Sequence, residues 1–70
     1  MKIRFSEHIP PSHREGILGE IEGMGATPQR LDEDEYFITF PKSTRYSFVV
    51  EFLRDEQRIG NLEFDESFLT

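Results

Sequence analysis

The sequence contains no cysteine, so it can form neither a disulfide nor a thiolate metal site. This absence suits a reducing compartment. No run of apolar residues is long enough to span a membrane. Residues 1–5, Met-Lys-Ile-Arg-Phe, lack the apolar stretch of a signal peptide. We therefore expect a cytoplasmic protein that makes no contact with membranes.

Basic residues are in short supply. The chain has 8 Lys and Arg against 14 Asp and Glu, which gives a formal net charge of −6. Nucleic acid and anionic membranes repel such a chain on average, so nucleic acid is disfavoured as a partner. A charge of this size is ordinary for solubility. It would also suit a protein partner with a basic surface, and both interpretations stay open.

Motifs that carry catalysis or bind metals are also missing. The two histidines, His8 and His13, stand near a Pro-Pro pair beside Ser6 and Ser12, but nothing in their arrangement indicates a hydrolytic triad. His-x4-His is not an established spacing for metal ligands. The acidic run 32–35 lacks the glycine and the terminal glutamate of a calcium loop. No glycine-rich phosphate loop occurs. The sequence predicts no enzyme, no metal and no cofactor.

The length of 70 residues fits one domain spanning residues 1–70. A hydrophobic content of 36% and an aromatic content of 13% argue against disorder, because there is enough apolar surface to bury. A chain of this size buries only about 60% of its unfolded surface, so good packing and association are its sources of stability. Seven phenylalanines can supply the packing, and self-association is a further option.

The first third of the chain predicts a strand and a helix. Residues 1–5 alternate apolar and charged side chains, which is typical of a half-buried strand. After the two prolines, Ser12 and Glu15 have the spacing of a capping box and should open a helix. Gly25 is well placed to end it. The apolar residues of this helix fall on one side: Ile17, Leu18, Ile21 and Met24.

Three further strands are expected. Residues 26–31 form a short strand, and residues 36–40 are rich in aromatic and β-branched side chains and form a central one. The acidic run 32–35 between them is most simply a solvated hairpin turn. Residues 59–64 form the last strand, with two apolar side chains facing inward and two polar ones facing outward: Leu62 and Phe64, then Asn61 and Glu63.

Residues 43–58 fit two interpretations. As a helix, they bury one stripe, Tyr46, Val49, Val50 and Leu53; as a strand, Tyr46, Phe48, Val50 and Phe52 alternate. Residues 54–58 hold no Gly, Asn or Pro to make the hairpin turn that a strand would need, which favours the helix. The predicted fold is then α+β, a ferredoxin-like βαββαβ sandwich. The alternative is βαβββ, one helix on a mostly antiparallel sheet.

Two surfaces stand out as candidate binding sites. Gly16, Gly19 and Gly23 lie on the face of the first helix opposite its apolar stripe. Each costs about 0.8–1 kcal/mol relative to alanine, so they are either a tolerated weakness or a smooth patch where a partner approaches the backbone. The second surface is the sheet face that the helices leave open, with Lys2, Arg4, Phe37 and Thr39, and with Asn61 and Glu63 on a neighbouring edge.

Phe37 stands beside two cations on this surface, so it could stack a base while a cation holds a phosphate. The ordinary alternative is a polar sheet face that carries one Phe and binds nothing.

Residues 36–40, followed by a helix, resemble the third strand of RNA recognition motifs. The resemblance implies that Phe37 takes one base-stacking position. The other falls on Glu35, an acid where the motif has an aromatic residue.

Residues 14–21 resemble the start of the first helix in ACT domains. Those domains are ferredoxin-like regulatory modules that bind amino acids near a glycine at this helix start. The resemblance implies that Gly16 matches that glycine, although Glu15 replaces the usual proline.

The sequence alone does not determine the function. The leading hypothesis is a small acidic, non-catalytic binding module that acts through protein–protein contacts, as an inhibitor, adaptor or small subunit. The alternatives are an ACT-like regulatory domain for small ligands and, behind it, a sheet that binds single-stranded RNA.

Overall fold

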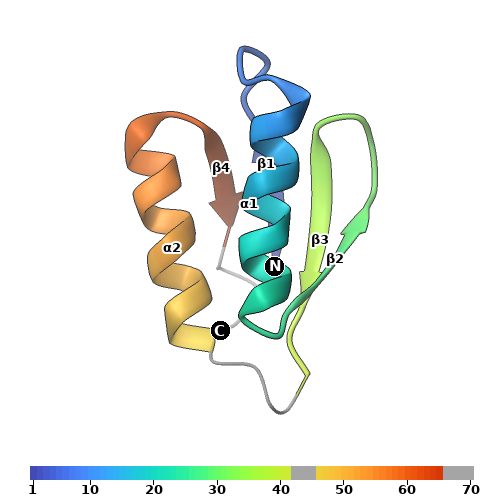
Figure 1. Ribbon diagram of the computed structural model, residues 1–70, viewed down its shortest axis with the longest axis vertical. Helices are drawn as coiled ribbons and strands as arrows, with labels where there is room; N and C mark the ends of the chain where they lie inside the picture. Colours follow the sequence, from blue (N-terminus) through green and yellow to red (C-terminus); the bar gives the residue numbers. More distant parts are fainter. Residues whose placement is uncertain (42–45, 66–70) are drawn as a thin grey trace.

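The computed structural model describes residues 1–41 and 46–65, and over these residues the chain is α+β. It has a four-stranded antiparallel sheet and two helices (Figure 1). The elements follow one another as β1 (Lys2–Phe5), α1 (Pro11–Gly23), β2 (Thr27–Arg30), β3 (Glu35–Thr39), α2 (Tyr46–Ile59) and β4 (Leu62–Asp65). This succession is compatible with the predicted βαββαβ arrangement.

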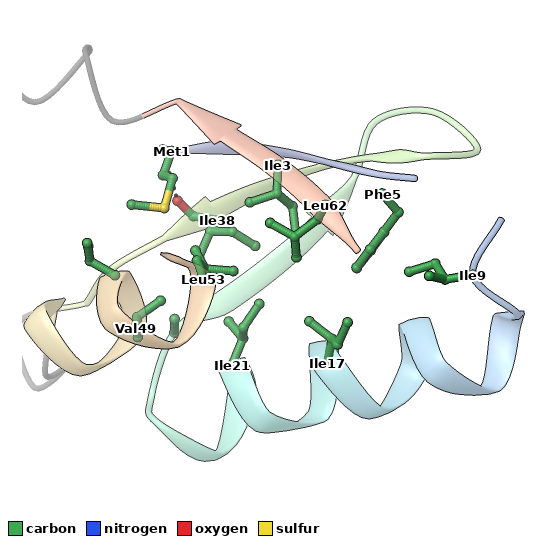
Figure 2. Close-up of a cluster of buried hydrophobic side chains, with 12 residues drawn as sticks. Met1, Ile3, Phe5, Ile9, Ile17, Ile21, Ile38, Val49, Leu53 and Leu62 are labelled. Carbon is green, nitrogen blue, oxygen red and sulfur yellow. Dashed lines mark hydrogen bonds between the residues drawn. The ribbon is translucent and has the colours of Figure 1, made fainter. Parts of the chain in front are cut away.

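The strands lie in the order β2-β3-β1-β4, and every neighbouring pair is antiparallel. β1 is therefore a central strand, paired with β3 on one side and with β4 on the other. In its register, Lys2 stands opposite Phe37 and Asp65, and Arg4 stands opposite Glu35 and Glu63. Both helices pack on the same face of the sheet (Figures 1 and 2), and neither helix covers the other face, which we call the open face.

The hydrophobic core fills the layer between the sheet and the helices (Figure 2). Every second residue of β1 points into it, because side chains alternate along a strand. The helices contribute residues spaced three or four apart, so that one side of each helix is buried. The buried members are Met1, Ile3, Phe5, Ile9, Ile17, Ile21, Ala26, Ile38, Val49, Val50, Leu53 and Leu62.

The segment with two interpretations is helical from Tyr46 to Ile59, so the alternative βαβββ fold is wrong. Residues 43–45 lie outside the described part of the chain. Val49, Val50 and Leu53 are buried on one side of α2, as the helical interpretation predicted, whereas Phe48 is 50% exposed. A strand would have needed Phe48 and Val50 on one face. The helix is preferred over the strand because it buries the three aliphatic residues on one side.

The last strand begins later than predicted, at Leu62 rather than at residue 59. Gly60 is the cause, since its φ of 97° lies in the left-handed region that favours glycine. Its N–H donates to the carbonyls of Glu56 and Gln57, and the Asn61 N–H also donates to Glu56. These bonds end α2 and turn the chain towards the sheet. Ile59 is consequently the last helical residue and is exposed.

The predicted capping box at Ser12 is wrong. α1 begins at Pro11, with Pro10 as the residue before it, and no side chain caps this end by a hydrogen bond. Proline suits the first helical position because its φ is already close to helical and its missing N–H would have had no helical partner. The Pro10 carbonyl accepts the N–H groups of His13 and Arg14, so Ser12 lies inside the first turn. Gly25, with φ of 93°, follows the helix end as expected.

Two glycines test this description of the backbone. We expect Gly60→Ala to lower the free energy of unfolding by about 1–2 kcal/mol, because a Cβ is strained at positive φ. Gly19→Ala is the matched control, since it adds the same methyl group in a helix where nothing lies within 4 Å. It should raise the free energy of unfolding by about 0.8–1 kcal/mol. Urea denaturation measures both, and equal effects of the two substitutions would contradict the assigned turn.

Candidate functional site

The open face of the sheet brings together the four residues predicted for it: Lys2, Arg4, Phe37 and Thr39. On β1, Lys2 and Arg4 are exposed while Ile3 between them is buried. On β3, Phe37 and Thr39 are exposed while Ile38 between them is buried. The register joins the two strands, because Lys2 lies directly opposite Phe37. Whether this face binds anything stays a prediction.

Glu35 joins both cations of this face. Its Oε2 lies 3.0 Å from Lys2 Nζ and 3.3 Å from Arg4 Nη2, and its side chain is only 17% exposed. The hydrogen bond from Lys2, followed by that from Arg4, holds the pKa of Glu35 below its ordinary value. The sequence marked Glu35 only as an acid in an aromatic position. Its actual role depends on the register that places it opposite Arg4.

Acidic residues also border the cations on the other side. β4 places Glu63 opposite Arg4 and Asp65 opposite Lys2. Among the described residues, the face thus holds two cations between three carboxylates, those of Glu35, Glu63 and Asp65. A shallow groove of about 240 Å³ runs between β1 and β4 among these residues, with Ile3 and Phe64 in its lining. The electrostatics of this face are mixed, with a small excess of negative charge.

Asn61 was expected to face outward near this edge, and that expectation is wrong. It is only 9% exposed and lies in the turn before β4 rather than in the strand. Its backbone carbonyl accepts the Ser6 N–H at 2.9 Å, and its side-chain Nδ2 lies 3.4 Å from His13 Nε2. The turn at Gly60 causes the difference, because it places Asn61 against the loop that leads into α1. Glu63 alone remains at the predicted edge.

The three glycines of α1 point away from the core, as predicted. Within residues 1–41 and 46–65, no atom lies within 4 Å of a Cβ built on Gly16, Gly19 or Gly23, so the space beside each is open to that part of the chain. Gly16 lines a groove of about 310 Å³ between the helices, together with His13, Ile17, Glu20, Phe52 and Glu56. Because α1 begins at Pro11, Gly16 lies in its second turn. The ACT resemblance had placed this glycine at the helix start.

Arg14 is a structural centre that sequence reasoning missed. Its Nη1 forms an ion pair with Asp34 Oδ1 and donates to the Glu33 carbonyl at 3.4 Å. Its Nε donates to the Ile9 carbonyl at 3.3 Å, and its Nη2 donates to the Ser6 carbonyl at 3.2 Å. One side chain therefore ties α1 to the loop before it and to the β2–β3 hairpin.

Residues 32–34 form the turn between β2 and β3, as predicted for residues 32–35, while Glu35 already belongs to β3. The contacts of Arg14 show that one acid of this turn, Asp34, is not simply solvated. Asp34 is half-buried against Arg14, and its carbonyl accepts the Phe5 N–H at 2.8 Å. The sequence did contain a signal that Arg14 pairs with an acid. Arg14 stands three residues before Ile17 and seven before Ile21, so the helical period places it on the side of the buried stripe. A basic residue at that position needs an acid to pair with.

Metal and membrane sites receive no positive indication. Within residues 1–41 and 46–65, no three His, Cys, Asp or Glu side chains gather closely enough to hold a metal ion. In the same part of the chain, neither helix has the length and apolar character needed to cross a bilayer.

Comparison with known proteins supplies no further guide. No family model matches the chain, and neither the curated proteins nor the solved structures contain a match.

The ion pairs of Glu35 predict a pH-dependent stability. The folded pKa of Glu35 lies below the unfolded one, so the carboxylate stabilises the fold above its unfolded pKa. That contribution is lost as the pH falls through the folded pKa. We expect Glu35→Gln to lower the melting temperature at pH 7 and to have progressively less effect below about pH 4. Glu22→Gln, an exposed substitution on α1, should have little effect at either pH. A pH-independent difference for Glu35→Gln would contradict the assignment.

Removing Arg14 tests the tie between α1 and the hairpin. Arg14 is 18% exposed and makes several hydrogen bonds, so Arg14→Ala should lower the free energy of unfolding by about 2–4 kcal/mol. Arg14→Lys should recover only part of this, because an ammonium group cannot reproduce the fork of a guanidinium. Chemical denaturation measures both. A lysine variant as stable as the wild type would show that charge alone matters.

Proposed function

We propose that the chain is a small acidic, non-catalytic binding module that acts through protein–protein contacts, and that the open face of its sheet is the contact surface. Its fold on this proposal is a ferredoxin-like sandwich, which the strand order β2-β3-β1-β4 supports. The observation that carries the proposal is the sharing of one carboxylate, Glu35, by both cations of that face.

This sharing argues for protein over nucleic acid. A phosphate that approached Lys2 or Arg4 would meet the negative charge of Glu35, which already lies beside both cations. It would also meet the carboxylates of Glu63 and Asp65, which lie on the neighbouring strand β4 opposite the two cations. Binding to nucleic acid draws its affinity from unneutralised cations, and this face offers a net excess of acids. A protein partner can present both charges and suits the mixed pattern better.

Phe37 adds an apolar anchor to the face. Its side chain is 38% exposed, on β3 opposite Lys2. Protein interfaces commonly combine an aromatic side chain near the centre with charged and polar groups around it. The roles of inhibitor, adaptor and small subunit all fit such a surface, and none requires catalysis.

The ACT-like alternative draws on the groove beside Gly16. That groove is bordered by the acids Glu20 and Glu56. Their charges would attract the amino group of a free amino acid but repel its carboxylate. The groove offers its ligand no matching Lys or Arg among its lining residues. The geometry therefore supports the protein-binding proposal better.

The proposal is tested by capture of partners with matched variants. Immobilised wild-type protein is compared with Phe37→Ala and Arg4→Glu in lysate of the source cells, and retained proteins are identified by mass spectrometry. Each candidate partner is then purified and titrated by calorimetry. We expect at least a tenfold loss of affinity for both variants, because an interface anchor contributes more than about 1.4 kcal/mol. Glu22→Gln on α1 is the control and should bind as the wild type does.

Two results would count against the proposal. Partners retained equally by wild type, Phe37→Ala and Arg4→Glu would move the contact surface away from the sheet. Binding of a single-stranded oligonucleotide in fluorescence anisotropy, abolished by the same two substitutions, would favour the RNA alternative instead.

A further inference from the structure

The open face is self-complementary along its two central strands, β1 and β3. Its four strands have a midline between β3 and β1, with one more strand on each side, β2 and β4. β1 presents cations, whereas β3 presents a carboxylate and an aromatic ring at the same two levels. Consider a two-fold axis that runs parallel to the strands, in front of this midline. Rotation by 180° about it places β1 of the second copy over β3 of the first, and β3 of the second copy over β1 of the first. A second copy so rotated would cover the whole face.

The register determines which side chains would meet. Because such an axis preserves the level along the strands, Arg4 lies over Glu35 of the second copy, and Lys2 lies over its Phe37. At the outer strands, Asp65 lies over Gln29 of the second copy, since both share the level of Phe37. These contacts are an ion pair, a cation over an aromatic ring and a hydrogen-bonding pair. Each occurs twice.

A different axis gives a worse result. If the two-fold axis ran across the strands, each strand would lie over its own copy. Lys2 would then approach Arg4 of the second chain, and Asp65 would approach its Glu63. Like charges would oppose each other on two strands, which costs free energy. Charge complementarity thus selects the axis parallel to the strands.

We propose that the first partner of the open face is a second copy of this chain, packed face to face about the axis between β1 and β3. The inference rests on the proposed function, because it names the occupant of the same surface. A four-stranded face of this length measures roughly 15–20 Å on a side. This is smaller than the surface of about 800 Å² per partner in standard interfaces. We therefore expect a weak dimer that dissociates when the protein is diluted.

Sedimentation equilibrium between about 5 and 500 μM, with salt near 0.15 M, measures the association. The wild type should change from the monomer mass of 8.3 kDa towards twice that mass. Arg4→Glu and Glu35→Arg should each weaken the dimer at least tenfold, because like charges then meet across the axis. An equimolar mixture of these two variants should associate as the wild type does. In that mixture the acids of the Arg4→Glu chain meet the arginines of the Glu35→Arg chain at both contacts.

The double variant Arg4→Glu/Glu35→Arg gives a second test that does not depend on the stability of the single variants. Residues 4 and 35 keep opposite charges in it, both within each chain and across the axis, so it should dimerise with itself. It should not mix with the wild type, because arginine would then face arginine. Arg58→Glu and Glu22→Arg change the charge by the same amounts on the helices and serve as controls. Both should dimerise as the wild type does.

A wild-type protein that stays monomeric at 500 μM would overturn the dimer, as would folded single variants whose mixture fails to associate. Neither result would decide the proposed function. That proposal is contradicted by captured partners that bind Phe37→Ala and Arg4→Glu as tightly as the wild type, or by an oligonucleotide whose binding these substitutions abolish. Conversely, a dimer that passes the charge-exchange test while no other protein is captured would leave self-association as the whole role of this face.

Discussion

β1 is the strand on which both the core and the candidate surface depend. It is hydrogen-bonded to β3 and to β4, and the Met1 carbonyl extends the pairing by accepting the Ile38 N–H at 2.7 Å. Its inward residues, Ile3 and Phe5, are buried, while its outward residues, Lys2 and Arg4, are the cations of the open face. A shift of register by one residue would exchange these two sets and drive charge into the core. The fold and the surface therefore share one constraint.

Some of the carboxylates of the chain form ion pairs within the fold. Asp34 holds Arg14, and Glu35 holds Lys2 and Arg4, so these acids neutralise basic residues that would otherwise define a cationic surface. The net charge of −6 consequently says little about which face meets a partner. The distribution of pairs is more informative, because the cations of the open face already have an acidic neighbour. A partner that binds the proposed surface would have to complement both signs.

The sequence could predict those features that depend on neighbours along the chain. The alternation of residues 1–5 and the stripe of Val49, Val50 and Leu53 identify their elements because each period buries one face. Boundaries were less predictable where two local signals competed. α1 begins at Pro11 rather than after a cap at Ser12, and the positive φ of Gly60 makes Ile59 the last residue of α2. Contacts between distant residues could not be predicted, because Arg14–Asp34 and Arg4–Glu35 require the strand order first.

The internal pairing of Glu35 does not prevent it from acting in an interface. Both of its ion pairs end on the same oxygen, Oε2. A carboxylate has two oxygens and can accept several hydrogen bonds, so a guanidinium from outside can be added without displacing Lys2 or Arg4. The internal pairs instead fix the orientation of the carboxylate before a partner arrives. Because less side-chain freedom is then lost on association, a small surface of this kind can still bind with specificity.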